Sequence, residues 1–216
     1  MKSIVTTLAL LAGAASAAPA QVLPQQLPSK IHLSAMAGMF APILPVVAIA
    51  NGVNASVELE SSSAVAVEFS YGLTTGASPI AAYLGLTHIR SRMNHSSALV
   101  LNGPARASSP VNLFTPSLGV LIQHQFGNLR IQPRLRLGVG VKFYEFNIAE
   151  VPDGVQDFTG DVGIGVVAGD GPVSFTAEAR WMPSSFDPAF LPVSVIGTEK
   201  QFQNDWAFLL GLRFGL

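Results

Sequence analysis

Strict two-residue alternation is the feature of this sequence that most restricts its fold. In LRIQPRLRLGVGVKF, residues 129–143, apolar side chains fill the odd positions, while Arg130, Arg134, Arg136 and Lys142 stand at even positions. Successive side chains of a β-strand point to opposite faces of the sheet, so this segment predicts a strand with one aliphatic and one cationic face. The same period recurs from residue 31 onward, and no segment keeps a helical period. The sequence therefore predicts an all-β protein.

The first twenty residues have the organisation of a cleaved export signal. Lys2 supplies a positive charge, residues 4–11 are apolar, and the small-residue sequences ASA and APA end at residues 17 and 20. This stretch falls short of the roughly 20 apolar residues that cross a bilayer as a helix. We therefore expect a signal peptide at residues 1–20 and a single exported domain at residues 21–216.

Composition and spacing argue against several classes of site. The chain has no cysteine, and its 12 Lys and Arg are interleaved with 13 Asp and Glu, which leaves no basic stripe for nucleic acid. Its four histidines lack metal-site spacing. GIGVVA (163–168) matches a dinucleotide-binding pattern, but it continues the strand alternation instead of opening a helix. We expect no catalytic residues, no cofactor, no metal and no nucleic-acid partner.

Alternation fits two architectures, a soluble sandwich with an aliphatic core and a membrane barrel with an aliphatic exterior. Short joints at 127–128 and 169–171 alternate with long connections at 93–115, 147–156 and 184–203, which is typical of transmembrane barrels. The prolines in APILPVVAIANG (41–52) also favour a loop. Splitting residues 57–73 at their serines would give nine strands. The preferred count gives eight strands, at 31–40, 57–73, 80–91, 116–126, 129–146, 157–168, 172–182 and 205–216.

Both signs of charge occupy the face opposite the aliphatic one. Enclosed charges are costly unless they are paired, so a narrow barrel needs matched cations and anions. We also expect Gly138, Gly140, Gly163 and Gly165 to face the lumen and make room for long side chains. The predicted ion-pair network that closes the lumen consists of Glu58, Glu68, Arg134, Arg136, Asp161, Glu178, Arg180 and Arg213.

Aromatic residues on the aliphatic face sort by height along the predicted strands. Two interfacial girdles are expected for a barrel in a bilayer, although aromatic residues also favour strands in general. The predicted periplasmic girdle is Tyr71, Phe126, Phe175 and Phe214, and the predicted outer girdle is Phe143, Phe158, Trp181 and Trp206.

Several segments, together with the export signal, carry a resemblance to a known group. WAFLLGLRF, RLGVGVKFYEF, DVGIGVVAGDG and AVAVEFSYGLT resemble strands of the small eight-stranded outer-membrane β-barrel proteins, the group of the opacity, OmpA-transmembrane-domain and OmpX types. The resemblance covers residues 31–216. It implies an eight-stranded antiparallel up-and-down transmembrane barrel in the bacterial outer membrane. Such a barrel would be inserted by the barrel assembly machinery and contact outer-membrane lipid and lipopolysaccharide; we expect a monomer.

Function is expected to be non-enzymatic, in envelope structure or in surface interaction through residues 93–115 and 184–203. The glycines and the apolar segment 41–52 keep open a porin-like alternative, a narrow channel or carrier for small or apolar solutes. A lipid A-type acyl hydrolase, with His32 activating Ser34, is less expected because no orienting carboxylate is identifiable. His88, Arg90 and Arg92 could contact lipopolysaccharide phosphates, but we favour a strand end already in a loop.

Overall fold

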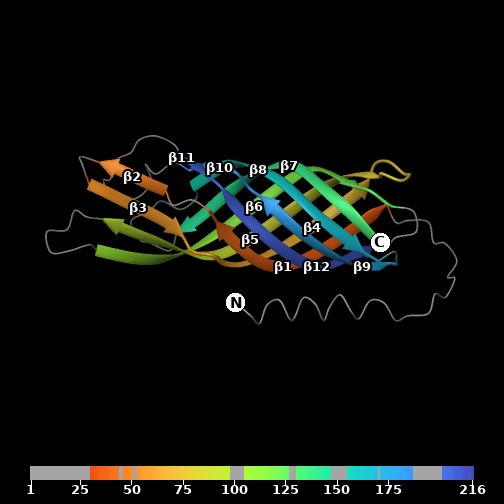
Figure 1. Cartoon of the computed structure of the whole chain (residues 1–216), viewed down its shortest axis with the longest axis horizontal. Helices are drawn as coiled ribbons and strands as arrows, with labels where there is room; N and C mark the ends of the chain where they lie inside the picture. Colours follow the sequence, from red (N-terminus) through yellow and green to blue (C-terminus); the bar gives the residue numbers. More distant parts are fainter. Residues whose placement is uncertain are drawn as a thin grey trace.

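Eight strands close into an antiparallel barrel (Figure 1). The computed structural model describes residues 30–43, 46–50, 53–97, 105–126, 130–146, 155–169, 171–186 and 201–216. β1 pairs with β4 and β12, and β9 pairs with β12 and β8, so the wall has no free edge. In order around the barrel the strands are β1 (Ile31–Pro42), β4 (Ser62–Gly72), β5 (Ile80–Ser97), β6 (Ala105–Gln123), β7 (Ile131–Phe146), β8 (Val155–Ala168), β9 (Val173–Trp181) and β12 (Asp205–Gly215).

Four short strands extend this wall at one end. β2 (Val46–Ala50) pairs with β3 (Val53–Leu59), and β3 pairs with the far part of β5. β10 (Ser184–Phe186) pairs with β8 and with β11 (Gln201–Gln203). Figure 1 shows the β2–β3 hairpin at the left end of the molecule, opposite the C-terminus. We call this end the outer end.

The opposite end, which we call the periplasmic end, carries short connections at 73–79, 124–130 and 169–172. Short turns take the periplasmic side in transmembrane barrels. Gly76 and Gly169 adopt φ values of 114° and 115° in two of these connections. This left-handed conformation suits glycine, and at Gly169 it agrees with the predicted hairpin chemistry of residues 169–171.

The predicted all-β class and the count of eight barrel strands are confirmed. The competing nine-strand count is wrong, because β3 and β4 follow one another along the same neighbour, β5, with an interruption at 60–61, so that β3 extends the position of β4 instead of adding a ninth strand to the barrel. The predicted export signal at residues 1–20 lies outside the described residues.

Three predicted loops are partly strand. β5 runs to Ser97 and β6 begins at Ala105, so the ends of the predicted loop 93–115 form a two-stranded ribbon. The ladder between the two strands continues to Ser97 and Ala105, while Met93, Val111 and Leu113 of the same segment are buried. β10 and β11 take up the ends of 184–203. The predicted loop 41–52 contains the end of β1 and all of β2, because a proline is compatible with a strand end.

Apolar side chains cover the outside of the barrel. Large exposed hydrophobic residues occur on every barrel strand, including Leu33, Val67, Leu84, Leu118, Leu137, Ile164, Phe175 and Leu210. A continuous apolar surface of this kind is unfavourable in water and favourable in hydrocarbon. The exterior therefore supports the barrel architecture and excludes a sandwich with these residues in its core. No helix in the described ranges is long and apolar enough to cross a membrane.

The eight predicted girdle residues fall into two groups at opposite ends of the barrel. Six of them directly follow a buried residue on their strand and so face outward, where Phe158 is 82% exposed. Phe126 lies just past the end of β6 and is exposed, and Phe214 is partly buried on β12. At the outer end Trp206 lies opposite Trp181 across the β12–β9 pair, and at the periplasmic end Phe175 lies opposite Leu212. Contact of the two groups with membrane interfaces stays a prediction.

Candidate functional site

Charged side chains from four strands meet inside the barrel, nearer its periplasmic end. The strands position them by alternation, since inward residues of one strand are two apart and those of neighbouring strands are in register. The charged layer consists of Glu68 on β4, Arg134 and Arg136 on β7, Asp161 on β8, and Glu178 and Arg180 on β9.

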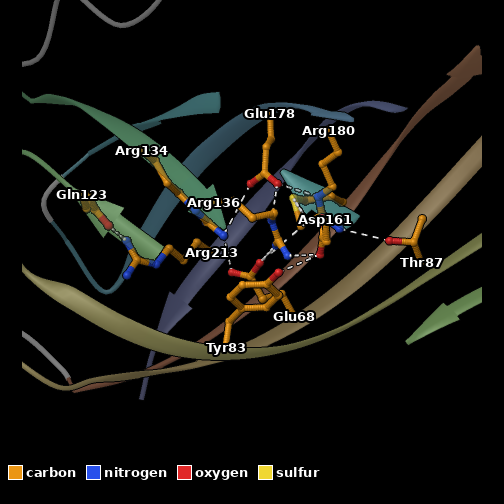
Figure 2. A network of polar contacts seen from close by, with 11 residues as sticks. Glu68, Tyr83, Thr87, Gln123, Arg134, Arg136, Asp161, Glu178, Arg180 and Arg213 are labelled. Carbon is orange, nitrogen blue, oxygen red and sulfur yellow. Dashed lines mark hydrogen bonds and ion pairs between the residues drawn. The ribbon is translucent and has the colours of Figure 1, made fainter. Parts of the chain in front are cut away.

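Arg136 lies at the centre of this charged layer and is 0% exposed (Figure 2). Its Nε donates to Glu178 Oε1 at 2.7 Å and its Nη1 to Asp161 Oδ2 at 2.9 Å, while Nη2 donates to Glu68. One guanidinium thus bonds to three carboxylates. Its Cζ also lies 4.0 Å from the centre of the Tyr83 ring, a cation–π contact, and the Tyr83 hydroxyl donates to Asp161 Oδ2 at 2.8 Å.

The two other arginines complete the network. Arg134 Nη2 donates to Glu68 and lies 3.5 Å from Glu178 Oε2. Arg180 donates from Nε to Glu178 at 2.5 Å and from Nη1 to Thr87 Oγ1 at 3.0 Å. Three cations therefore balance three anions. Balance and charge-assisted hydrogen bonds offset the cost of removing six charges from water.

Glycines make space for the network at two positions. A Cβ added at Gly138 would lie 2.0 Å from the Tyr83 hydroxyl, and one at Gly163 would lie 3.3 Å from Arg136 Cδ. These two have the predicted role of making room for long side chains. At Gly140 and Gly165 the contacts closer than 3.0 Å are with backbone oxygens of adjacent strands, at 2.6 and 2.4 Å, and no network cation is among the nearest atoms. They allow close strand approach instead.

Towards the outer end the lumen contains a packed apolar cluster, which the sequence interpretation missed. Phe40, Ile89, Leu113, Met182 and Leu209 point inward and are at most 1% exposed. They belong to one packed cluster that we call the apolar layer: Met36, Phe40, Ala64, Ala66, Ile89, Met93, Val111, Leu113, Tyr144, Met182, Ala207 and Leu209.

One buried ion pair lies beside the apolar layer. Lys142 Nζ donates to Asp205 Oδ2 at 2.7 Å, to the Met182 carbonyl at 2.7 Å and to Ser184 Oγ at 2.8 Å. All three hydrogens of the ammonium are used, which is how a buried lysine is best accommodated. Lys142 and Asp205 share a face with the predicted network residues, so the alternation could have identified them.

The structure brings six of the eight predicted network residues together and leaves two outside. Glu58 lies on β3, beyond the barrel strands, and its side chain is exposed. Arg213 lies near the periplasmic end and donates to Gln123 Oε1 at 2.9 Å instead of to an acid. Tyr83, which bonds within the network, was not predicted.

The candidate hydrolase pair does not form a catalytic arrangement. His32 and Ser34 both face the lumen, Ser34 is 0% exposed, and its hydroxyl has no hydrogen-bond partner in the described part of the chain. Among the described contacts, His32 makes no hydrogen bond to this hydroxyl. The described residues also contain no group of three or more acids and histidines arranged for a metal ion.

His88, Arg90 and Arg92 lie within β5, so the interpretation of a strand end already in a loop is wrong. They point outward, with Arg90 and Arg92 exposed, and His88 stacks on Phe114 with ring centres 4.5 Å apart. The ladder with β6 continues through all three residues, which keeps this segment extended.

Comparisons with known proteins agree on the fold. No protein-family model matches the chain, and no curated protein sequence matches it either. Among solved structures, Neisserial surface protein A matches with a TM-score of 0.50 and 11% identity over 88% of this chain and 100% of that one. The outer membrane enzyme PagL matches with a TM-score of 0.38 and 13% identity over 86% and 99% of the two chains, too weakly to support an argument.

At 11% identity the likeness to the Neisserial protein shows the fold alone. It confirms the resemblance to small eight-stranded outer-membrane barrels. Closed barrels with an apolar exterior are the β-structures that cross membranes, because every backbone group is paired within the wall. Fold and exterior together support the predicted location in the bacterial outer membrane.

Proposed function

We propose that this protein is a closed, non-conducting barrel with a structural or surface-interaction role in the cell envelope. The observation that carries the proposal is that the network bonds cross the lumen. Arg136 on β7 connects Glu68 on β4 with Asp161 on β8, and these two strands are four apart in a ring of eight. A side-chain bridge between opposite walls occupies the central path that a solute would need.

The apolar layer supports the same proposal. A hydrated ion that passed the charged layer would next meet Phe40, Leu113 and Leu209, which are packed and buried. Transferring a charge into such surroundings without compensation is strongly unfavourable. The two layers are therefore successive barriers of different chemistry.

The lengths of β5 and β6 support a role at the cell surface. A transmembrane strand needs about 9–11 residues. β9 and β12 have 9 and 11 residues, whereas β5 and β6 have 18 and 19. The surplus, with the β2–β3 hairpin beside it, forms extended backbone beyond the outer end, where a partner could bind.

Planar-bilayer recording tests closure. Folding is verified beforehand on gels, where the unboiled folded barrel migrates differently from the boiled protein. The amount of barrel incorporated into proteoliposomes is measured from the band of the folded form. We expect no discrete conductance steps from membranes containing folded protein. Discrete openings that scale with the amount of incorporated barrel would contradict the proposal and favour the channel alternative.

A non-enzymatic role is tested separately. Purified folded protein should release no acyl chains from lipopolysaccharide, and Ser34→Ala should match it. Acyl release that is lost in Ser34→Ala would contradict a purely structural role.

Lipopolysaccharide is the partner we propose for the outward basic residues of β5. Arg90 and Arg92 are exposed and follow the apolar, exposed Leu84 and Leu86 towards the outer end. Arginine pairs well with phosphate. The double variant Arg90→Gln/Arg92→Gln should bind lipopolysaccharide more weakly, whereas Arg130→Gln at the periplasmic end should not. Equal lipopolysaccharide binding by the unchanged protein, the double variant and Arg130→Gln would contradict this partner.

A further inference from the structure

Hydrogen-bond donors gather in the lumen at the periplasmic side of the charged layer, and one of them, Arg134, belongs to that layer. β1 contributes His32 and Ser34, β4 contributes Ser70, β12 contributes Arg213 and β7 contributes Arg134. The pairing of β1 places Ser34 between Arg213 of β12 and Glu68 of β4, and it places His32 opposite Ser70 of β4. The carboxylate of Glu68 accepts hydrogen bonds from Arg134 and Arg136. Three adjacent strands therefore bring four of these side chains to one part of the wall.

The guanidinium group of Arg213 has few hydrogen-bond acceptors around it. Its Nη1 donates across the lumen to Gln123, but its Nε is buried without a partner, and no ion pair joins it to an acid of the described residues. Figure 2 shows Arg213 and Gln123 beside Arg134, to one side of the acids that Arg136 holds. Since the charged layer is already balanced, Arg213 adds an uncompensated positive charge.

Arg134 is buried and only partly used. Its side chain is 1% exposed, and its bonds to the acids involve Nη2, while Nε and Nη1 have no hydrogen-bond partner among the described residues. The hydroxyls of Ser34 and Ser70 are likewise buried and without partners. A buried donor without a partner is destabilising, so this group of residues favours an added acceptor.

Electrostatics point to the same chemistry. The positive charges of Arg134 and Arg213 repel each other, and both disfavour a positive charge on His32. A ligand that accepts several hydrogen bonds and carries negative charge would satisfy the donors and reduce the repulsion.

We propose that Arg134, Arg213, Ser34 and Ser70 form a binding site for a small oxyanion, such as phosphate or a carboxylate, that enters from the periplasm. His32 and Arg213 are partly exposed at the mouth, while Arg134, Ser34 and Ser70 are buried beneath them. The charged and apolar layers close the far side, so the ligand leaves by the way it entered. This site is independent of the proposed surface role at the outer end.

Calorimetric titration of the folded barrel in a zwitterionic detergent tests the site. Sodium phosphate is the first probe and sodium acetate the second, each at an ionic strength held constant with sodium chloride. We expect saturable binding of at least one of them. Arg213→Gln should weaken that binding at least tenfold, and Ser34→Ala should weaken it several-fold.

Arg130→Gln is the matched control, because it removes one exposed positive charge at the same end of the barrel. It should bind like the unchanged protein. Binding of acetate but not phosphate identifies a carboxylate ligand and supports the site. Absence of saturable binding, or an equal loss in Arg130→Gln and Arg213→Gln, overturns the proposal. A difference in gel migration before and after boiling verifies that each variant folds. If Arg213→Gln does not fold, Ser34→Ala provides the test.

Discussion

The two layers of the lumen, charged and apolar, achieve the same burial by different means. In the charged layer, Arg136 and Arg180 are 0% exposed. Hydrogen bonds to carboxylates of three other strands hold Arg136, while Arg180 donates to Glu178 of its own strand and to Thr87 of β5. In the apolar layer, Phe40 and Leu113 are equally buried and are held by contact with other apolar side chains. A small membrane barrel therefore need not have a uniformly polar interior. Part of its lumen can pack like the core of a soluble protein.

This difference predicts different sensitivity to substitution. Removing one partner from the charged layer leaves buried charges without compensation, so a single change has a large effect. Removing atoms from the apolar layer leaves a cavity, and the cost depends on how far the surroundings relax. The predictions below separate these two responses through the free energy of unfolding, measured by urea titration of the folded barrel in detergent.

Arg136→Ala should have the largest effect. It leaves Glu68, Asp161 and Glu178 with fewer cations, and we expect a loss of about 3–5 kcal/mol in unfolding free energy. Arg136→Lys keeps the charge but cannot bond to three acids at once, so it should lose less than Arg136→Ala. A loss below about 1 kcal/mol in Arg136→Ala, the value of an exposed pair, would mean that the network is solvated.

Leu113→Ala should cost about 2–5 kcal/mol, because it empties space in the packed apolar layer. Leu118→Ala is the control on the same strand, since Leu118 is 60% exposed on the outside, where lipid can fill the gap. It should cost clearly less. Equal losses in the two variants would indicate that the apolar layer is not packed.

Tyr83→Phe should cost about 1.5–3 kcal/mol, because it removes a hydrogen bond to the charged Asp161 and keeps the ring over Arg136. Tyr71→Phe, on the exposed outer face, is its control and should be near neutral. The account of a tightly connected charged layer fails if the two phenylalanine variants unfold alike.

Lys142→Met combined with Asp205→Leu should have the smallest effect, within about 1 kcal/mol of the unchanged protein, because both charges of a buried pair are replaced by apolar groups at once. Lys142→Met alone should cost more, since it leaves Asp205 buried and unpaired. A double variant as unstable as Lys142→Met alone would show that other buried groups depend on this ion pair, as they do in the charged layer.

Alternation made much of the fold predictable. The predicted segments 129–146 and 205–216 became β7 and β12 with ends that differ by at most two residues. Period-two sequence separates the two faces of a strand directly. For the same reason Arg134, Arg136 and Arg180 were correctly assigned to one side of the wall.

Alternation did not predict how far along the barrel axis a residue lies or which side chains it contacts across the lumen. Glu58 shares the parity of Glu68, but the interruption at 60–61 and the length of β5 place it past the barrel strands. Which side chains meet across the lumen depends on the stagger of all eight strands, which no single segment encodes. The apolar layer was missed because Phe40 and Leu209 do not differ chemically from lipid-facing residues.

Thiol accessibility tests the closed lumen most directly, since the chain has no cysteine of its own. Ala66 faces the lumen opposite Met36 and is 2% exposed, whereas Ala77 is exposed in the turn after β4. A membrane-impermeant methanethiosulfonate should label Ala77→Cys rapidly, and label Ala66→Cys only after unfolding. Labelling of folded Ala66→Cys at the rate of Ala77→Cys would show a water path through the barrel and contradict the account.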